Sequence, residues 1–350
     1  MTLIQKPILG FSHLLSEDLD KILLQNSRYL QYFDGKRVLI LGGTGFVGKW
    51  LVGALLQAQN ELNLNTELVV MTRSASLAAK MIRPKDSSRI TFLEHDLTHS
   101  AATNIGSFDI FIHGATPSVP QTGSKNPTGV RNSSINGTHT ILNAVKRYNG
   151  NSRVLNLSSG AVYGNLRTPE GTVPEMEEFG QAENSYAQVK IDIEQELNAI
   201  KFAHPIQVTH ARLFAFAGPF ISLSDHFAIG NFLSDILYKS QISVLGNPMT
   251  TRSYMYPTDL VASLLRVLCK PEISHINIGS SDSYKMQEIA EICSEIGGNL
   301  PIELTGEDKI ASHYVPVVEL QTQSLQLTQL YDFQSSIVQW LRWLNEINAP

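Results

Sequence analysis

Residues 37–48 read RVLILGGTGFVG. The apolar run Val38–Leu41 has the length of one buried strand, and glycines follow at positions 42, 45 and 48, where a helical pattern begins. Glycines in this arrangement allow a tight turn, let backbone N–H groups approach a pyrophosphate and let the helix pack closely on the strand. The helix N-terminus would then face the phosphates with the positive end of its dipole. A turn without a ligand is the alternative, but the strand-loop-helix setting favours a dinucleotide site.

The rest of the chain repeats this alternation of short apolar runs and longer helical segments. The pattern predicts an α/β Rossmann fold, a doubly wound parallel sheet with a smaller C-terminal α/β lobe. We expect strands at 37–41, 67–72, 90–94, 110–113, 153–157 and 207–213, and helices near 46–59, 75–82, 130–148 and 184–203. After Pro219 the spacing is irregular, with a strand at 242–245 and helices near 226–239, 258–269, 285–297 and 335–345.

These patterns divide the chain into three parts. Residues 1–34 form an N-terminal extension, residues 35–216 an NAD(P)-binding domain and residues 217–350 a substrate-binding lobe. Leucines recur at helical spacing over 12–31, which predicts an amphipathic helix in the extension. We expect this helix to pack on its own subunit, with a special partner site as the alternative.

Composition excludes several classes of protein. With 43% hydrophobic and 17% charged residues, the chain of 350 residues is expected to be globular. The net charge is -5 and the Lys and Arg residues are scattered, so we expect no nucleic-acid partner. Apolar runs are strand-sized and no signal-peptide pattern is visible, so we expect no membrane association and a cytoplasmic location. The two cysteines, Cys269 and Cys293, lack metal-ligand spacing, and we predict no metal site.

A second constellation suggests catalysis of alcohol oxidation. Tyr186 and Lys190 lie four residues apart on a predicted helix, downstream of Ser159 at the end of the fifth strand. A base on the hydroxyl proton is needed for such a reaction, and a nearby ammonium group lowers the pKa of a phenol toward that role. The Tyr-x-x-x-Lys spacing also occurs at Tyr32 and Lys36, before the first strand, so the spacing alone is weak. Order and setting favour Tyr186 as catalytic rather than as an ordinary helix-face aromatic residue.

With these motifs, the chain from about Lys36 to Leu344 resembles the extended short-chain dehydrogenase/reductase superfamily, in particular its NAD-dependent nucleotide-sugar epimerases and dehydratases. The resemblance implies a catalytic trio of Ser159, Tyr186 and Lys190, with Asn136 supporting the site. It implies that Arg252 binds the nucleotide diphosphate, against the alternative of a surface arginine. It also suggests a homodimer formed through a helix bundle.

The expected site is wider than the trio. The expected cofactor contacts are Gly42, Thr44, Gly45, Phe46, Val47, Gly48, Thr72, Arg73, Asp96, Leu97, Gly114, Ala115, Thr116, Asn136, Leu157, Tyr186, Lys190 and Leu213. The expected contacts with a nucleotide-diphosphate sugar are Ser118, Ser159, Asn231, Leu245 and Arg252.

The choice of dinucleotide depends on the end of the second strand. Arg73 follows Thr72 there, and no Asp or Glu occupies positions 72 to 74. An arginine at this point favours the 2′-phosphate of NADP, although it can also stack on the adenine of NAD. We expect NADP or NAD, with NADP slightly favoured.

Departures from the family pattern bear on the reaction. Sugar 4,6-dehydratases carry an Asp-Glu pair after the catalytic hydroxyl residue, and UDP-glucuronate decarboxylases tend to carry an acid there; here these positions hold Gly160 and Ala161. Ala215 also stands where many relatives place an Asn that contacts substrate. The expected reaction is therefore 4-epimerisation through a transient 4-keto sugar. A 4-keto sugar reductase, a dehydratase that uses an acid from elsewhere and a catalytically silent NAD(P)-binding regulator are the alternatives.

Overall fold

The alternation of side chains along the first strand sets the layers of the molecule. In the computed structural model, which describes residues 13–82, 89–116, 127–148, 151–223, 227–306 and 310–348, β1 (Arg37–Leu41) lies between two parallel neighbours. Val38 and Ile40 belong to one apolar cluster, whereas Leu39 and Leu41 belong to another on the opposite face. A strand buried on both faces requires such a continuous apolar run.

Seven parallel strands form the main sheet, in the order β3-β2-β1-β4-β5-β6-β9. Besides β1, the strands of this sheet are β2 (Glu67–Thr72), β3 (Ile90–Glu94), β4 (Ile110–His113), β5 (Arg153–Ser159), β6 (Gln207–Leu213) and β9 (His275–Ile278). This order confirms the predicted Rossmann fold. The last strand, β9, was not predicted.

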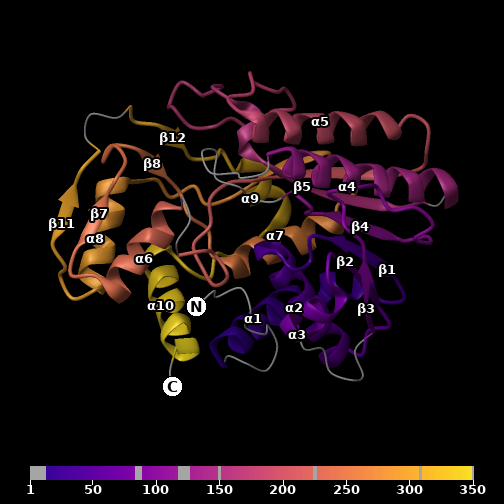
Figure 1. Cartoon of the computed structure of the whole chain (residues 1–350), viewed down its shortest axis with the longest axis horizontal. Helices are drawn as coiled ribbons and strands as arrows, with labels where there is room; N and C mark the ends of the chain where they lie inside the picture. Colours follow the sequence, from indigo (N-terminus) through magenta and orange to yellow (C-terminus); the bar gives the residue numbers. More distant parts are fainter. Residues whose placement is uncertain are drawn as a thin grey trace.

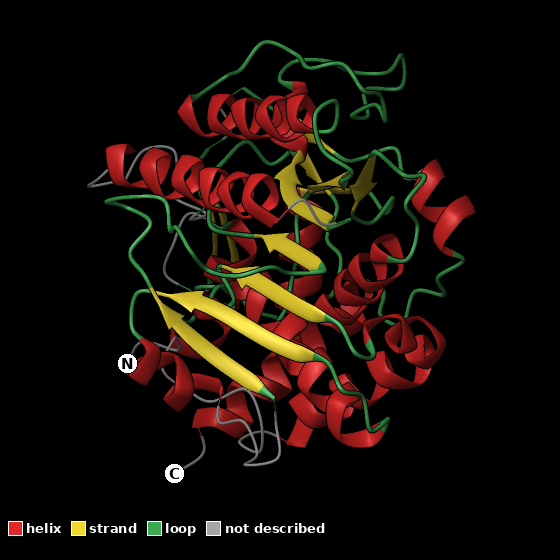
Figure 2. Cartoon of the chain, turned by 90° about the vertical axis from the view of Figure 1, so that its right-hand side faces the viewer, coloured by secondary structure: helices red, strands yellow, loops and turns green. Residues whose placement is uncertain are grey.

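Helices cover both faces of this sheet (Figures 1 and 2). On one face α4 (Pro127–Tyr148) and α5 (Ser185–Ile200) pack side by side, and their apolar residues join the cluster of Leu39 and Leu41. The other face is covered by α2 (Phe46–Glu61) and α7 (Pro257–Leu268), and α3 (Ala75–Ile82) packs beside α2 and β3.

The later part of the chain forms smaller units at one end of the main sheet (Figure 1). A two-stranded parallel sheet pairs β7 (Ile242–Val244) with β11 (Ile302–Leu304), and α6 (Ala228–Tyr238) and α8 (Met286–Ile296) pack against each other and against this sheet. A three-stranded sheet has the order β10-β8-β12, formed by Tyr284–Lys285, Thr251–Arg252 and His313–Tyr314. The chain ends with α9 (Glu319–Leu325) and α10 (Phe333–Asn348). The predicted domain bounds stay a prediction, although β9 shows that the later segment also completes the main sheet.

The N-terminal helix α1 (His13–Leu30) packs against α7, α2 and α10, followed by a short 3-10 turn, η2 (Gln31–Phe33). The buried Asp18 carboxylate accepts hydrogen bonds from the hydroxyl groups of Tyr256 and Tyr331, each 2.7 Å long. The prediction that this helix packs on its own subunit is confirmed. Among the described helices, none is both long enough and apolar enough to cross a membrane.

Candidate active site

The glycine loop after β1 is shaped by close backbone contacts. Gly42 has φ +85°, and a Cβ atom there would lie 2.3 Å from the Gly114 carbonyl oxygen. A Cβ atom at Gly48 would lie 2.2 Å from the carbonyl oxygen of Gly42, so neither position accepts a side chain. Gly45 is the N-cap of α2 and provides no side-chain cap. The first N–H groups of α2, including those of Phe46 and Val47, are therefore open to an anion. Thr44 lies within the loop.

The predicted adenosine side of the site lies at the ends of β2 and β3. Thr72 is the last residue of β2, and the exposed Arg73 follows it. Hydrogen bonds from the backbone and hydroxyl of Thr98, 2.9 and 2.8 Å long, hold the pKa of Asp96 below its usual value, with a smaller contribution from Arg73. Arg73 and Asp96 thus interact electrostatically.

Asn136 supports this region from α4. Its side-chain amide donates a 2.8 Å hydrogen bond to the carbonyl oxygen of Leu97, which fixes the loop after β3. Gly114, Ala115 and Thr116 follow β4 and lie beside the glycine loop through the contact of Gly114 with Gly42. The predicted substrate residue Ser118 lies outside the described residues.

The predicted trio is brought together by the end of β5 and the first turns of α5. Ser159 is the last residue of β5, while Tyr186 and Lys190 face it from α5, whose N-cap Asn184 accepts a 2.9 Å hydrogen bond from the Ala187 N–H. Lys190 Nζ lies 5.7 Å from the centroid of the Tyr186 ring. It donates a 2.6 Å hydrogen bond to the Leu157 carbonyl oxygen. The Tyr186 phenol also interacts with the Ser159 hydroxyl.

Burial controls the protonation of this trio. It lowers the pKa of Lys190 to about 7, and the charge of Glu194, one turn along α5, opposes that shift. Burial raises the pKa of Tyr186, while its hydrogen bond with Ser159 acts in the opposite direction. Glu194 is itself held by the Arg212 guanidinium at 2.8 Å and by the Ser158 hydroxyl. The trio therefore rests on a buried ion pair that keeps a negative charge near Lys190.

The second lobe contributes Arg252, on β8. Its guanidinium donates hydrogen bonds to the carbonyl oxygens of Thr251 and Ser312, at 2.8 and 3.2 Å, and to the Ser312 hydroxyl, at 2.9 Å. Tyr314 pairs with Arg252 in the register of β8 and β12, and the guanidinium lies 6.0 Å from the centroid of its ring. Arg252 is therefore held in a fixed position beside Tyr314.

Sequence comparison identifies the family. The pattern of the NAD dependent epimerase/dehydratase family matches residues 38–279, which contain both the glycine loop and the trio. The chain belongs to this family. The resemblance inferred from the sequence is confirmed, and the protein is an enzyme of this dinucleotide-dependent family.

The chain is similar in sequence to nucleotide-sugar enzymes and in fold to solved structures of epimerases. UDP-glucuronic acid decarboxylase 5 of Arabidopsis thaliana is 29% identical over 280 residues, which cover 78% of this chain and 77% of the relative. Two solved structures share the fold at a TM-score of 0.76. An epimerase from Methanothermobacter thermautotrophicus is 20% identical and covers 93% of this chain and 96% of its own. A UDP-N-acetylglucosamine 4-epimerase from Methanobrevibacter ruminantium M1 is 19% identical, and the match covers 89% of this chain and 98% of that epimerase.

Tyr314 was missed by the sequence analysis of this family member. Its phenol interacts with Ser159 and, electrostatically, with Tyr186. Its ring stacks on Phe214 with the ring centroids 4.8 Å apart. No motif surrounds Tyr314 in the sequence, and only the pairing of β12 with β8 places it at the site.

The remaining predicted residues are distributed around this centre. Leu213 ends β6 and pairs in register with Ser159. Asn231 lies on α6 and Leu245 follows β7 with 57% of its surface exposed. Both elements lie at the left of Figure 1, whereas α5 lies at the upper right. The role of these two residues as substrate contacts stays a prediction.

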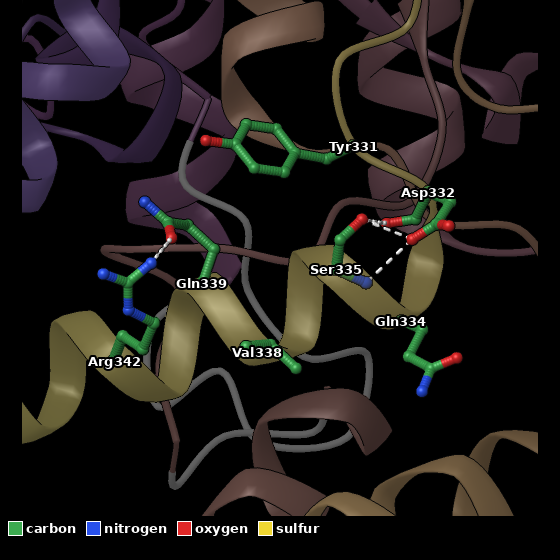
Figure 3. A pocket seen from close by; sticks show the side chains of 7 residues that line it. All are labelled: Tyr331, Asp332, Gln334, Ser335, Val338, Gln339 and Arg342. Carbon is green, nitrogen blue, oxygen red and sulfur yellow. Dashed lines mark hydrogen bonds between the residues drawn. The ribbon is translucent and has the colours of Figure 1, made fainter.

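A separate hollow of about 370 Å³ lies along α10. Figure 3 shows its lining, in which Ser335 and Asp332 hydrogen-bond each other and Arg342 donates to Gln339. None of the predicted site residues lines it. Within the described part of the chain, no group of three or more His, Cys, Asp or Glu residues could hold a metal ion.

Proposed function

We propose that the protein is a nucleotide-sugar 4-epimerase that oxidises the C4 hydroxyl of the sugar to a transient ketone and reduces it from the opposite face. One observation carries this proposal. The trio is assembled as alcohol oxidation requires, while Gly160 and Ala161, directly after Ser159, have no ionisable side chain. The residues can therefore move the C4 proton, but these two positions provide no acid for elimination of water.

Each member of the trio has one task in this reaction. Tyr186, as phenolate, takes the proton from the C4 hydroxyl and returns it when the ketone is reduced. Ser159 donates a hydrogen bond to the C4 oxygen, whose charge changes during the reaction. Lys190 stabilises the phenolate as an ammonium ion, because a positive charge nearby favours the ionised phenol.

The glycine loop fits a nicotinamide dinucleotide. Gly42 and Gly48 exclude side chains from the cradle, and α2 begins there with N–H groups that no side chain caps. Gly45 would hold the pyrophosphate closely, Arg73 and Asp96 would flank the adenosine, and Lys190 would hold the nicotinamide ribose. A nicotinamide ring held there would supply reversible hydride transfer at C4. We propose NADP rather than NAD, on the position of Arg73.

The space in front of Gly160 argues further against an acid at this point. A Cβ atom on Gly160 would lie 2.5 Å from Phe214 Cζ and 2.7 Å from the Tyr314 hydroxyl oxygen. The volume that an acidic side chain would need is filled by two aromatic rings. This packing supports the 4-epimerase over a 4,6-dehydratase that uses that acid pair.

Decarboxylation is a second candidate, favoured by the similarity to UDP-glucuronic acid decarboxylases. Oxidation at C4 would place a ketone β to a C6 carboxylate, and such a β-keto acid loses carbon dioxide. The same trio would serve this reaction. The absence of an acid at positions 160 and 161 makes it the weaker candidate.

Incubation with a panel of UDP-, dTDP-, GDP- and CDP-sugars, including UDP-glucuronic acid, tests these alternatives. Products would be followed by NMR and mass spectrometry, with Tyr186→Phe as the matched inactive control. A product epimeric at C4 with unchanged mass is expected. Loss of one water or of carbon dioxide from the substrate would instead show a dehydratase or a decarboxylase, and net consumption of reduced dinucleotide a ketoreductase. If none of the sugars exchanges hydrogen with the bound dinucleotide, the protein is a catalytically silent regulator.

We also propose that the enzyme acts as a cytoplasmic homodimer, with α4 and α5 at the interface. A surface hollow of about 620 Å³ lies over these helices, lined by residues including Leu142 and Ala199. Sedimentation analysis should give twice the mass of one chain. A Leu142→Lys variant that stays dimeric would place the interface elsewhere.

A further inference from the structure

Ser159 lies between two phenols. Tyr186 approaches it from α5 and Tyr314 from β12, and both phenols interact with its hydroxyl. The Tyr314 hydroxyl lies beside the adjacent Gly160, 2.7 Å from the position of a Cβ atom there. Tyr314 therefore adds a third hydroxyl to those of Ser159 and Tyr186 in the described part of the site. We propose that Tyr314 is a positioning residue that orients the Ser159 hydroxyl toward Tyr186 and the reacting oxygen. This inference rests on the proposed function of the trio.

The hydrogen-bonding capacity of a serine hydroxyl makes the arrangement directional. A hydroxyl accepts two hydrogen bonds and donates one. The Ser159 oxygen accepts one from the Ala161 N–H, 3.2 Å away, as the N-cap of the 3-10 turn η3 (Gly160–Tyr163). Tyr314 can donate to the remaining lone pair, and the single serine proton is then left for Tyr186 or the sugar oxygen.

Burial keeps Tyr314 a donor. It raises the pKa of Tyr314 above the usual value for a phenol, and the hydrogen bond with Ser159 only partly opposes this shift. Tyr314 therefore stays protonated near neutral pH. Its proton has to be shared with an acceptor, and Ser159 is that acceptor.

The position of Tyr314 is fixed by its neighbours. Its ring stacks on Phe214 and flanks the Arg252 guanidinium. The backbone on its C-terminal side is held at Val173, whose N–H donates to the Val315 carbonyl at 2.7 Å and whose carbonyl accepts from the Val317 N–H at 2.8 Å. The absence of a side chain at Gly160 leaves room for the Tyr314 hydroxyl, which would lie 2.7 Å from a Cβ atom there.

A double-mutant cycle tests whether Tyr314 acts through Ser159. Tyr314→Phe removes the hydroxyl and leaves the ring on Phe214. We expect kcat to fall roughly tenfold, with KM changed less than about threefold, because one hydrogen bond contributes about 1 kcal/mol or somewhat more. In a Ser159→Ala background the same substitution should have no further effect. Equal losses in both backgrounds would show that Tyr314 acts independently of Ser159 and would overturn the proposal.

Tyr284→Phe is the matched control, since Tyr284 lies in the same small sheet, on β10, and packs on Phe333. It should leave kcat and KM unchanged. A decrease in kcat equal to that of Tyr314→Phe would indicate a general effect on the lobe and contradict the specific role.

A second measurement needs no substrate and separates this inference from the proposed function. The absorbance of phenolate is measured as a function of pH in the dinucleotide-bound protein. Subtracting the curve of Tyr186→Phe from that of the wild type gives the titration of Tyr186 alone. Tyr314→Phe should raise the pKa of Tyr186 by about one unit, because the hydrogen-bond chain to its phenolate is interrupted. An unchanged titration would refute the role of Tyr314. A raised pKa in a protein that converts no nucleotide sugar would retain the inference and reject the proposed function.

Discussion

The two halves of the candidate site are assembled by different means. Tyr186 and Lys190 lie one turn apart on α5. Ser159 is the last residue of β5, the strand that precedes α5 along the chain. Arg252 and Tyr314 lie far apart in the sequence, and the pairing of two strands of two residues each brings them together. Local spacing therefore determines the first half, whereas long-range pairing determines the second. The sequence therefore pointed to the whole first half, but in the second half only to Arg252 and not to Tyr314.

Removal of the Tyr186 hydroxyl should have the largest effect. Tyr186→Phe is expected to lower kcat by about 10²–10⁴-fold and to leave dinucleotide affinity nearly unchanged, because it removes the acid/base group and little volume. Lys190→Met should weaken both turnover and cofactor binding. Steady-state kinetics and dinucleotide titration provide the measurements. Activity of Tyr186→Phe above about a tenth of wild type would contradict the assignment.

The second Tyr-x-x-x-Lys pair supplies an internal control. Lys36 Nζ lies 4.7 Å from the centroid of the Tyr32 ring, so this pair has the same spacing and a similar contact. It lies before β1, at the opposite end of the parallel sheet from Ser159, which is the last residue of β5. Tyr32→Phe should leave kcat unchanged, which would show that the setting rather than the spacing makes Tyr186 catalytic.

The half formed by the second lobe should act mainly on substrate affinity. Arg252→Ala is expected to raise KM for the nucleotide sugar by about ten- to a hundredfold, since a hydrogen bond to a charged group contributes about 1.5–3 kcal/mol. The dinucleotide affinity should stay constant. Arg252→Lys should recover only part of the loss because an ammonium group lacks the guanidinium fork. An unchanged KM in Arg252→Ala would remove this residue from the site.

Most of the main sheet could be predicted because each strand is a local apolar run. Five of the six predicted strands have the predicted bounds, and β5 extends two residues further, to Ser159. The strand β9 was missed because it is short and alternates polar and apolar residues, His275 to Ile278, in a region without a clear period. Its place beside β6 follows from the tertiary structure alone.

The candidate site follows the same division. Gly42, Gly48 and the trio could be identified because strand ends and helix starts position them within a few residues. Tyr314 could not, because its register with Arg252 and its contact with Ser159 depend on segments distant in sequence. The packing of Phe214 and Tyr314 in front of Gly160 could not be predicted either. From the sequence one sees only that this position lacks an acidic side chain.

The packing in front of Gly160 gives a prediction about stability. Gly160→Ala should lower the free energy of unfolding by about 1–3 kcal/mol, because the added Cβ atom overlaps Phe214 and Tyr314. Denaturant titration provides the measurement, and a second substitution, Phe214→Leu, should recover part of the loss. Gly246→Ala is the control, since no atom lies within 4 Å of a Cβ there.

The same argument applies to an acid pair. Gly160→Asp with Ala161→Glu is expected to destabilise the protein rather than to produce a working dehydratase. If Gly160→Ala were as stable as wild type, the two aromatic rings could move aside and the packing argument against an acid would fail.

The smallest expected effect is on the preference for NADP over NAD, which depends on a residue of the cofactor site that the sequence predicted. Arg73 offers a fixed positive charge to a 2′-phosphate, but Asp96 lies close enough for each charge to influence the other. The two carboxylate oxygens of Asp96 reduce the attraction that Arg73 can exert, although the hydrogen bonds from Thr98 already occupy one of them. We therefore expect NADP to bind about tenfold more tightly than NAD, a difference of about 1.4 kcal/mol.

Titration of cofactor-free protein with both dinucleotides measures the ratio of the two affinities, which should approach one in Arg73→Ala. Arg89→Ala is the matched control, because this exposed arginine precedes β3 at the opposite end of the strand from Asp96 and should leave the ratio unchanged. Equal or tighter binding of NAD by the wild type would show that Arg73 does not contact the phosphate, and would leave the role of the trio unaffected.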